Sequence, residues 1–123
     1  MFLNCIFVGA GGFLGSVCRY LVGLIPALHK GILPWQTMFV NIAGAFLIGV
    51  IMRTSERCGG MNAHALLLLQ VGFCGGFTTF STFSAETFHL FANGKYGPAI
   101  LLVVLSVTLC LAGVFTGRWV AGH

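Results

Sequence analysis

Four long apolar stretches, separated by short polar segments, make up almost the whole chain. We expect them over residues 2–24, 35–52, 65–91 and 98–119. A helix needs about 20 mainly apolar residues to cross a bilayer, so each stretch is long enough to span one. Only 7% of the 123 residues are charged, which is too few to cover a water-soluble globule. The sequence therefore predicts an all-α integral membrane protein, a single domain over residues 1–123 with four transmembrane helices.

The third stretch is interrupted by glycines and hydroxyl residues in the segment Gly72-Phe-Cys-Gly-Gly-Phe-Thr-Thr-Phe-Ser-Thr-Phe-Ser-Ala-Glu86. The adjacent Gly75 and Gly76 weaken a helix, which predicts a break near Gly75–Thr79. Peptide groups freed at membrane depth are tolerated only when they are buried in protein or line a water-filled cavity. This segment therefore indicates a binding site or a pore, whose walls so small a chain would complete by forming an oligomer.

An aromatic row and a hydroxyl row run side by side along the second half of this stretch. Phe80 and Phe83 share one face, and the neighbouring stripe carries Thr78, Ser81, Thr82 and Glu86. In ordinary membrane helices such phenylalanines face lipid and such hydroxyls bond to the preceding turn. The adjacent break favours a lined pathway instead. Phenyl ring edges and hydroxyl groups present positive partial charge to an anion, whereas the role of Glu86 stays open.

The other stretches supply few further polar candidates. Thr37 and Asn41 lie four residues apart on the second stretch, where a membrane asparagine more often joins helices than binds a ligand. Ser106 and Cys110 have the same spacing on the fourth stretch and, taken alone, would be packing residues. Arg19, near the end of the first stretch, is expected to extend toward the membrane interface or to shape the electrostatic potential at a pore mouth.

Several functional classes lack the residues that they require. The four histidines have no metal-ligand spacing, and the five scattered cysteines are interpreted as small apolar fillers. No nucleophile–base pair, paired carboxylates or Walker loop is present, and the six basic residues are too dispersed for a nucleic-acid surface. We therefore expect neither an enzyme nor a nucleic-acid partner. The first stretch is interpreted as a span rather than a removed signal peptide.

The basic residues are divided almost equally between the two ends of the predicted bundle. The end with the N-terminus carries Arg53, Arg57 and Arg118, and the opposite end carries Lys30, Lys95 and, if it extends outward, Arg19. Because an excess of basic residues on one side sets membrane orientation, this balance predicts insertion both ways up. Two oppositely oriented copies could then pair about a two-fold axis in the membrane plane, as an antiparallel homodimer.

Three motifs together resemble the Fluc-type, or CrcB, family of fluoride channels. They are Gly12-x-x-Gly15-x-x-x-Arg19-Tyr20 in the first stretch, Thr37-x-x-x-Asn41-x-x-Gly44 in the second and, most specific, the run from Gly72 to Phe83 in the third. The resemblance covers nearly the whole chain. It implies a dual-topology, antiparallel homodimer in a bacterial plasma (inner) membrane, with two pores that export toxic fluoride by passive electrodiffusion and so give fluoride resistance.

The resemblance also implies roles for individual residues. Phe80 and Phe83 would turn their ring edges toward the ion, and Asn41 would be an amide of the pore. Ser106 and Cys110 would belong to a polar track on the fourth helix, where Cys110 stands in place of an expected hydroxyl residue and donates more weakly. The remaining residues would be track or vestibule positions, namely Thr37, Ser81, Thr82 and, in the vestibule, Arg19.

The resemblance further implies one bound metal ion. A structural sodium ion on the dimer axis, which does not permeate, would be held by the backbone carbonyls of Gly75 and Thr78 of both subunits. Carbonyl oxygens freed by a helix break suit a hard cation.

Two other classes stay open on the sequence. A small proton-coupled multidrug or guanidinium antiporter shares the size and the four spans, but it needs an acidic residue inside a span, and the first stretch has none. A non-transporting membrane scaffold would leave the break in the third stretch without a purpose.

Overall fold

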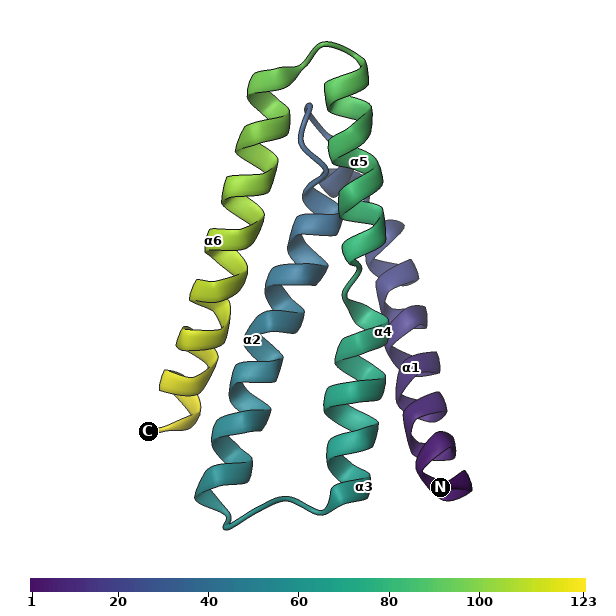
Figure 1. Cartoon of the computed structure of the whole chain (residues 1–123), viewed down its shortest axis with the longest axis vertical. Helices are drawn as coiled ribbons and strands as arrows, with labels where there is room; N and C mark the ends of the chain where they lie inside the picture. Colours follow the sequence, from purple (N-terminus) through teal and green to yellow (C-terminus); the bar gives the residue numbers. More distant parts are fainter.

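Four membrane-length helical segments run side by side in the computed structural model, which describes residues 1–123 (Figure 1). Both termini and the α2–α3 loop lie at one end of the molecule (Figure 1). The third segment, Ala63–Ala92, is divided into four helical pieces. The elements in chain order are α1 (Phe2–Gly23), the 3₁₀ helix η1 (Pro26–His29), α2 (Trp35–Arg57), α3 (Ala63–Leu66), the π-helical η2 (Leu67–Cys74), α4 (Gly75–Phe77), α5 (Phe80–Ala92) and α6 (Tyr96–Ala121).

The predicted all-helical fold with four spans is confirmed, although one helix end differs. All four segments are long and apolar enough to cross a bilayer. The second span, expected to end at Met52, continues to Arg57. Charged residues in this last part bond to the end of α6, which extends the helix beyond the apolar stretch.

The break in the third segment falls within the predicted interval but has a different cause. Gly75 and Gly76 are helical, and the chain becomes extended only at Thr78 (ψ 158°) and Thr79 (φ −149°, ψ 112°). A Cβ atom on Gly76 would lie 2.6 Å from the carbonyl oxygen of Gly12. The prediction that the glycines themselves open the helix is therefore wrong, because Gly76 instead allows α1 to approach closely.

Close backbone contacts organise the four segments into two pairs. α1 packs on η2 and α4, and α2 packs on α6. A side chain on Gly15 would overlap the carbonyl oxygen of Phe73, and one on Gly49 would overlap that of Val114. Small residues bring membrane helices together because they let backbones touch. Gly15 and Gly49 thus lie at the close contacts that hold the two helix pairs.

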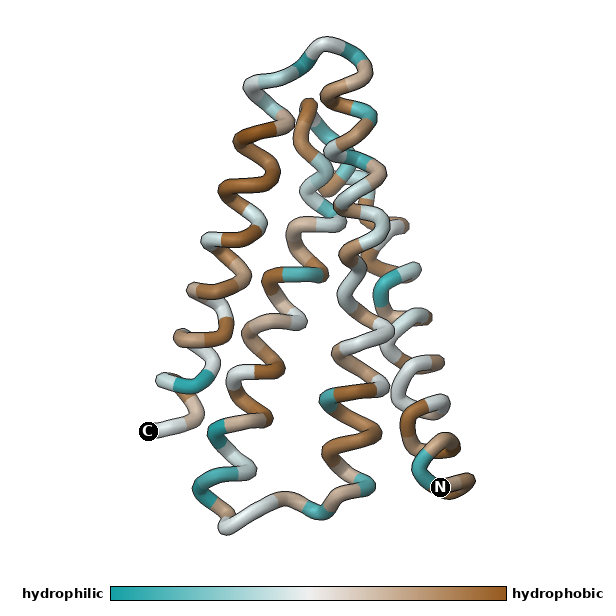
Figure 2. Tube along the Cα trace, in the orientation of Figure 1, coloured by the Kyte–Doolittle hydropathy of each residue, from teal (hydrophilic) through white to brown (hydrophobic).

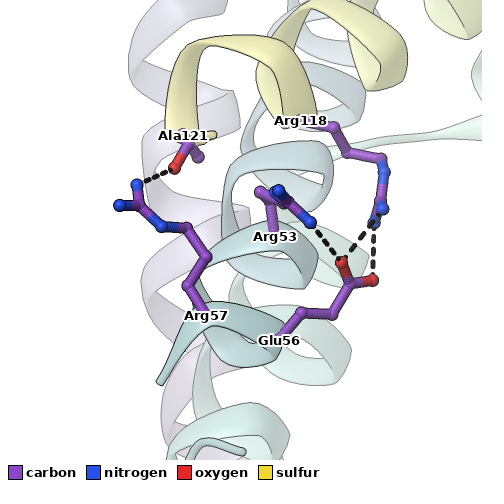
Figure 3. A network of polar contacts seen from close by, with 5 residues as sticks. All are labelled: Arg53, Glu56, Arg57, Arg118 and Ala121. Carbon is purple, nitrogen blue, oxygen red and sulfur yellow. Dashed lines mark hydrogen bonds and ion pairs between the residues drawn. The ribbon is translucent and has the colours of Figure 1, made fainter. Parts of the chain in front are cut away.

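A network of polar side chains joins α2 to α6 at the end that carries the C-terminus (Figure 3). The Glu56 carboxylate accepts hydrogen bonds from both terminal nitrogens of Arg118, at 2.8 and 3.0 Å, and from Arg53 at 3.3 Å. Arg57 donates to the carbonyl oxygen of Ala121 at 2.7 Å, which satisfies one of the free carbonyls at the end of α6. These contacts reinforce the glycine-mediated pairing of the two helices.

The outer faces of the bundle are apolar, as a membrane protein requires. Only 16 of the 123 residues are buried, and many large apolar side chains point outward. Hydrophobic colour dominates the middle of the trace, and hydrophilic residues gather mainly at the two ends (Figure 2). The chain is a multi-pass membrane protein whose exposed apolar surface faces lipid or another protein chain.

Replacing Gly15 with alanine should weaken the docking of α1 on the third segment. The added methyl group meets the Phe73 carbonyl, and overpacking of this kind costs about 1–3 kcal/mol. We expect a lower thermal unfolding midpoint in detergent. Gly9→Ala on the same helix is the matched control, because its Cβ meets nothing within 4 Å. Equal midpoints for the two variants would contradict the close contact.

Candidate functional site

One side chain from α2 holds the break in the third segment. The amide oxygen of Asn41 accepts a hydrogen bond from the backbone N–H of Thr79 at 2.7 Å, and its amide nitrogen donates to the Thr79 carbonyl at 3.1 Å. The interpretation of Asn41 as a link between helices is therefore confirmed. An amide NH₂ has two hydrogens, so one N–H of Asn41 is not used by Thr79. This leaves it able to serve in a site as well.

Hydroxyl groups complete the polar contacts of the break. The Thr78 hydroxyl donates to the carbonyl of Cys74 at 2.9 Å, and the Thr79 hydroxyl accepts from the backbone N–H of Thr82 at 3.2 Å. The second contact caps the first turn of α5. The carbonyl oxygens of Gly75 and Thr78 accept none of the hydrogen bonds that surround the break.

Arg19 reaches the third segment just before this break. Its Nε donates to the carbonyl oxygen of Gly76 at 3.1 Å. The side chain therefore reaches across from α1 to α4, and its position relative to the membrane interface stays a prediction. A carbonyl near the break supplies a partner for this part-buried guanidinium.

A cavity of about 310 Å³ lies beside the break, between α2, α5 and α6. It brings together five of the candidate residues from three separate stretches of sequence, namely Asn41, Phe80, Phe83, Ser106 and Cys110. Thr78 from the break also lines it. The remaining walls are apolar and comprise Ala45 and Ile48 from α2 and Val107 and Val114 from α6.

Ser106 is the most informative residue of this cavity. Three other hydroxyls in the spans, those of Ser84, Thr87 and Thr116, donate to the carbonyl four residues earlier at 2.7–2.9 Å. The Ser106 hydroxyl has no such bond and no other partner, although the residue is only 7% exposed. A buried polar group without a partner is costly, so one retained here points to a ligand or water.

Phe80 and Phe83 form the aromatic wall. Their ring centroids lie 5.5 Å apart with the planes tilted by 50°. The ring of Phe80 is 78% exposed on the surface of the protomer, so the cavity reaches the outside of the bundle beside it. A second protein chain or lipid must cover this wall in the membrane.

Thr37 and Glu86 belong to a different part of the molecule. The Thr37 hydroxyl donates to Glu86 Oε1 at 2.9 Å, and Oε2 is buried without a partner. Glu86 lines a second cavity of about 300 Å³ whose walls include His29, His89 and Lys95, near the loops that follow α1 and α5. Thr37 and Glu86 are thus brought together, but neither lines the cavity beside the break.

The remaining candidates lie next to the break without lining either cavity. Thr82 accepts a hydrogen bond from the Thr79 hydroxyl at 3.0 Å, and Ser81 is exposed with its hydroxyl 3.4 Å from the same group. Their assignment to a track or vestibule stays a prediction, as does the vestibule position of Arg19. In this protomer Ser81 and Thr82 lie in the first turn of α5, next to the Thr79 hydroxyl.

Two kinds of site residue escaped the sequence reasoning. Thr79 carries the peptide group that Asn41 binds, and its spacing to Thr82 is the hydroxyl pattern of a helix N-cap, which could have located the break. The apolar walls were also missed, although Asn41, Ala45 and Ile48 recur at helical spacing on one face of α2.

The cavity is equipped to receive a small anion. Its polar groups are neutral donors, namely a serine hydroxyl, a spare amide N–H and a weakly donating thiol, and two phenyl rings stand beside them. The surrounding apolar walls limit water, which strengthens each electrostatic contact. None of its side chains forms a metal cluster or a nucleophile–base pair.

Comparison with known proteins identifies the family. The chain matches the family model described as "CrcB-like protein, Camphor Resistance (CrcB)" over residues 6–118. The "Fluoride-specific ion channel FluC" of Geobacter sulfurreducens is 50% identical over 107 residues, which cover 86% of each protein. Its namesake from Elusimicrobium minutum is 48% identical over 113 residues, 89% of this chain and 86% of the relative. The protein of the same name from Ruminiclostridium cellulolyticum is 41% identical over 120 residues, which cover 97% of this chain and 92% of the relative. On this match along nearly its full length, the chain belongs to the CrcB family.

Proposed function

We propose that this chain forms a fluoride-specific channel in the bacterial cell membrane, through which fluoride leaves the cell by passive electrodiffusion. The relatives that share up to 50% of its residues carry the name of a fluoride-specific ion channel. The observation that carries the proposal is the cavity beside the break, where the unpartnered hydroxyl of Ser106 and the rings of Phe80 and Phe83 share one space.

The chemistry of the cavity suits fluoride. A small, hard anion holds water tightly, and it enters a dry space only if donors replace that water. Ser106 offers an O–H, Asn41 offers its spare N–H, and the ring edges of Phe80 and Phe83 carry positive partial charge. Because all of these groups are neutral, they hold the ion weakly enough for it to leave, as conduction requires.

The alternative of a proton-coupled antiporter is not supported. Such a transporter binds substrate and proton in turn at an acidic residue in a common site. Glu86, the acidic residue nearest to the break, lies outside the cavity and is bonded to Thr37. The CrcB family match also argues against it.

We further propose that two oppositely oriented copies complete the pore. Phe80 is 78% exposed, so one wall of the cavity needs another chain to close it. With Arg19 bonded to the break, three arginines at one end stand against two lysines at the other. A difference of one basic residue gives little preference for either orientation.

A structural sodium ion between the copies fits the same region. The carbonyl oxygens of Gly75 and Thr78 accept none of the surrounding hydrogen bonds and are therefore available as hard oxygen ligands. Two copies would supply four such oxygens. When bound, the ion would add a fixed positive charge and join the two broken segments.

Phe80→Ile and Phe83→Ile should each lower fluoride efflux from liposomes by about tenfold, because an aromatic contact of this kind is worth up to about 1.5 kcal/mol. Isoleucine keeps an apolar side chain but has no ring edge. Phe88→Ile is the control, since Phe88 lies on α5 and lines neither cavity. Unaltered efflux in both test variants would reject the role of the rings.

Ser106→Ala and Asn41→Ser should separate conduction from folding. Ser106 bonds to no protein group, so its loss should lower efflux while the thermal midpoint changes little. Asn41→Ser frees both backbone groups of Thr79 at about 1–3 kcal/mol each, so both the midpoint and efflux should fall. Thr116→Ala, outside the cavity beside the break, is the control for Ser106. Full efflux in Ser106→Ala would remove the hydroxyl from the pathway.

The paired assembly is tested on the same protein. A C-terminal tag should be found on both sides of the membrane in about equal amounts, given the small difference in basic residues. Replacing sodium with N-methyl-D-glucamine should separate the copies and stop efflux. A tag confined to one side would contradict the opposite orientations, and a stable, conducting dimer without sodium would contradict the bound ion.

A further inference from the structure

Cys110 differs from the other four cysteines in what surrounds it. It is partly buried on α6 and lines the cavity beside the break. Cys74 is fully buried in the third segment, and Cys5 and Cys58 are exposed outside the cavity. Cys18 on α1 also lines neither cavity. Cys110 is therefore the one thiol that shares a space with the candidate pathway.

The groups around this thiol indicate a space that receives a ligand. Ser106 lies one helical turn away in the same wall, is only 7% exposed, and keeps a hydroxyl without a partner. Asn41 faces the cavity from α2 with one N–H to spare. The cavity is thus lined by two hydrogen-bond donors without a protein partner, and the sulfur of Cys110 lines the same cavity.

We propose that Cys110 is a modification site inside the permeation cavity, where a small neutral thiol reagent attaches and blocks the passage of ions. This inference rests on the proposed function. The cavity has a volume of about 310 Å³, and any group tethered to Cys110 takes part of that volume away from the ion. It also replaces the S–H donor and stands in front of Ser106.

The neutral side chains of the cavity determine which reagents react. No acid, base or cation among the lining residues activates the thiol, so the reagent must itself be reactive. Alkyl methanethiosulfonates meet this need and carry no charge. The Cys110 sulfur forms a disulfide bond with the alkylthio sulfur of the reagent, and the thiol proton passes to solvent. The bond between the alkylthio sulfur and the sulfonyl group breaks, and methanesulfinate leaves with the electron pair. A dithiol reductant then reduces the mixed disulfide, which restores the Cys110 thiol, releases the alkanethiol and leaves the reductant as its own disulfide.

The experiment treats wild-type protein in liposomes with methyl or benzyl methanethiosulfonate and measures both fluoride efflux and the mass of each cysteine peptide. The benzyl reagent should lower wild-type efflux at least about tenfold and the methyl reagent less, because the benzylthio group occupies more of the cavity than the methylthio group does. Dithiothreitol should restore the untreated rate. Each rate is compared with that of the same protein before treatment.

Two variants locate the effect. Cys110→Ser should lose the sensitivity, because a hydroxyl does not react with methanethiosulfonates, and its treated rate is compared with its own untreated rate. Cys58→Ser is the matched control with a thiol removed outside the cavity, and it should be blocked like the wild type.

Two outcomes would overturn the proposal. One is an unmodified Cys110 when Cys58 has reacted completely, since the thiol would then not face reachable space. The other is complete modification of Cys110 with unchanged efflux, which would place the sulfur beside the path rather than in it. A wild-type protein without any untreated efflux would instead reject the proposed channel, and the mass of the Cys110 peptide would still decide whether the thiol is reachable.

Discussion

The two hydrogen bonds between Asn41 and the peptide groups of Thr79 are the interaction on which this structure depends. An interrupted helix inside a bilayer has no water to satisfy its free N–H and C=O groups. Each group left unpaired costs about several kcal/mol. Asn41 supplies both partners from α2. Because α2 is packed tightly on α6, the same contact also sets the distance between the break and the wall that carries Ser106. Fold and cavity therefore follow from one constraint.

The two halves of the third segment pack against different helices. The first half of the third segment packs on α1 through glycines such as Gly15, and Arg19 adds a bond to the Gly76 carbonyl. The second half, α5, packs against α6 and α2 instead. The break is the place where the segment passes from one pair to the other. An unbroken helix would have to follow a single partner, and α5 would then lose its place opposite the polar residues of α6.

Much of this could be predicted from the sequence, because hydrophobicity and glycine spacing act locally. The four spans and the interval of the break both follow from such signals. The shared location of Asn41, Phe80, Phe83, Ser106 and Cys110 was suggested only by the family resemblance. The partner of each polar group was harder to predict, since it depends on which helices meet. Arg19 bonds to the carbonyl of Gly76, and Thr37 bonds to Glu86 away from the cavity. Gly75 and Gly76 were expected to break the helix because propensity was considered without tertiary contacts such as the one that α1 makes at Gly76.

The isolation of the Ser106 hydroxyl has a consequence for speed. A hydroxyl already bonded to the preceding turn would have to rotate away and break that bond every time an ion arrived, and reform it afterwards. Ser106 has no such bond to break, so in the proposed pathway an arriving ion would displace only a water molecule from this hydroxyl. Exchanging one hydrogen-bond acceptor for another at this hydroxyl would keep the energy barriers along the proposed pathway low. The unpaired hydroxyl of Ser106 would thus favour rapid passage of ions through the proposed pathway.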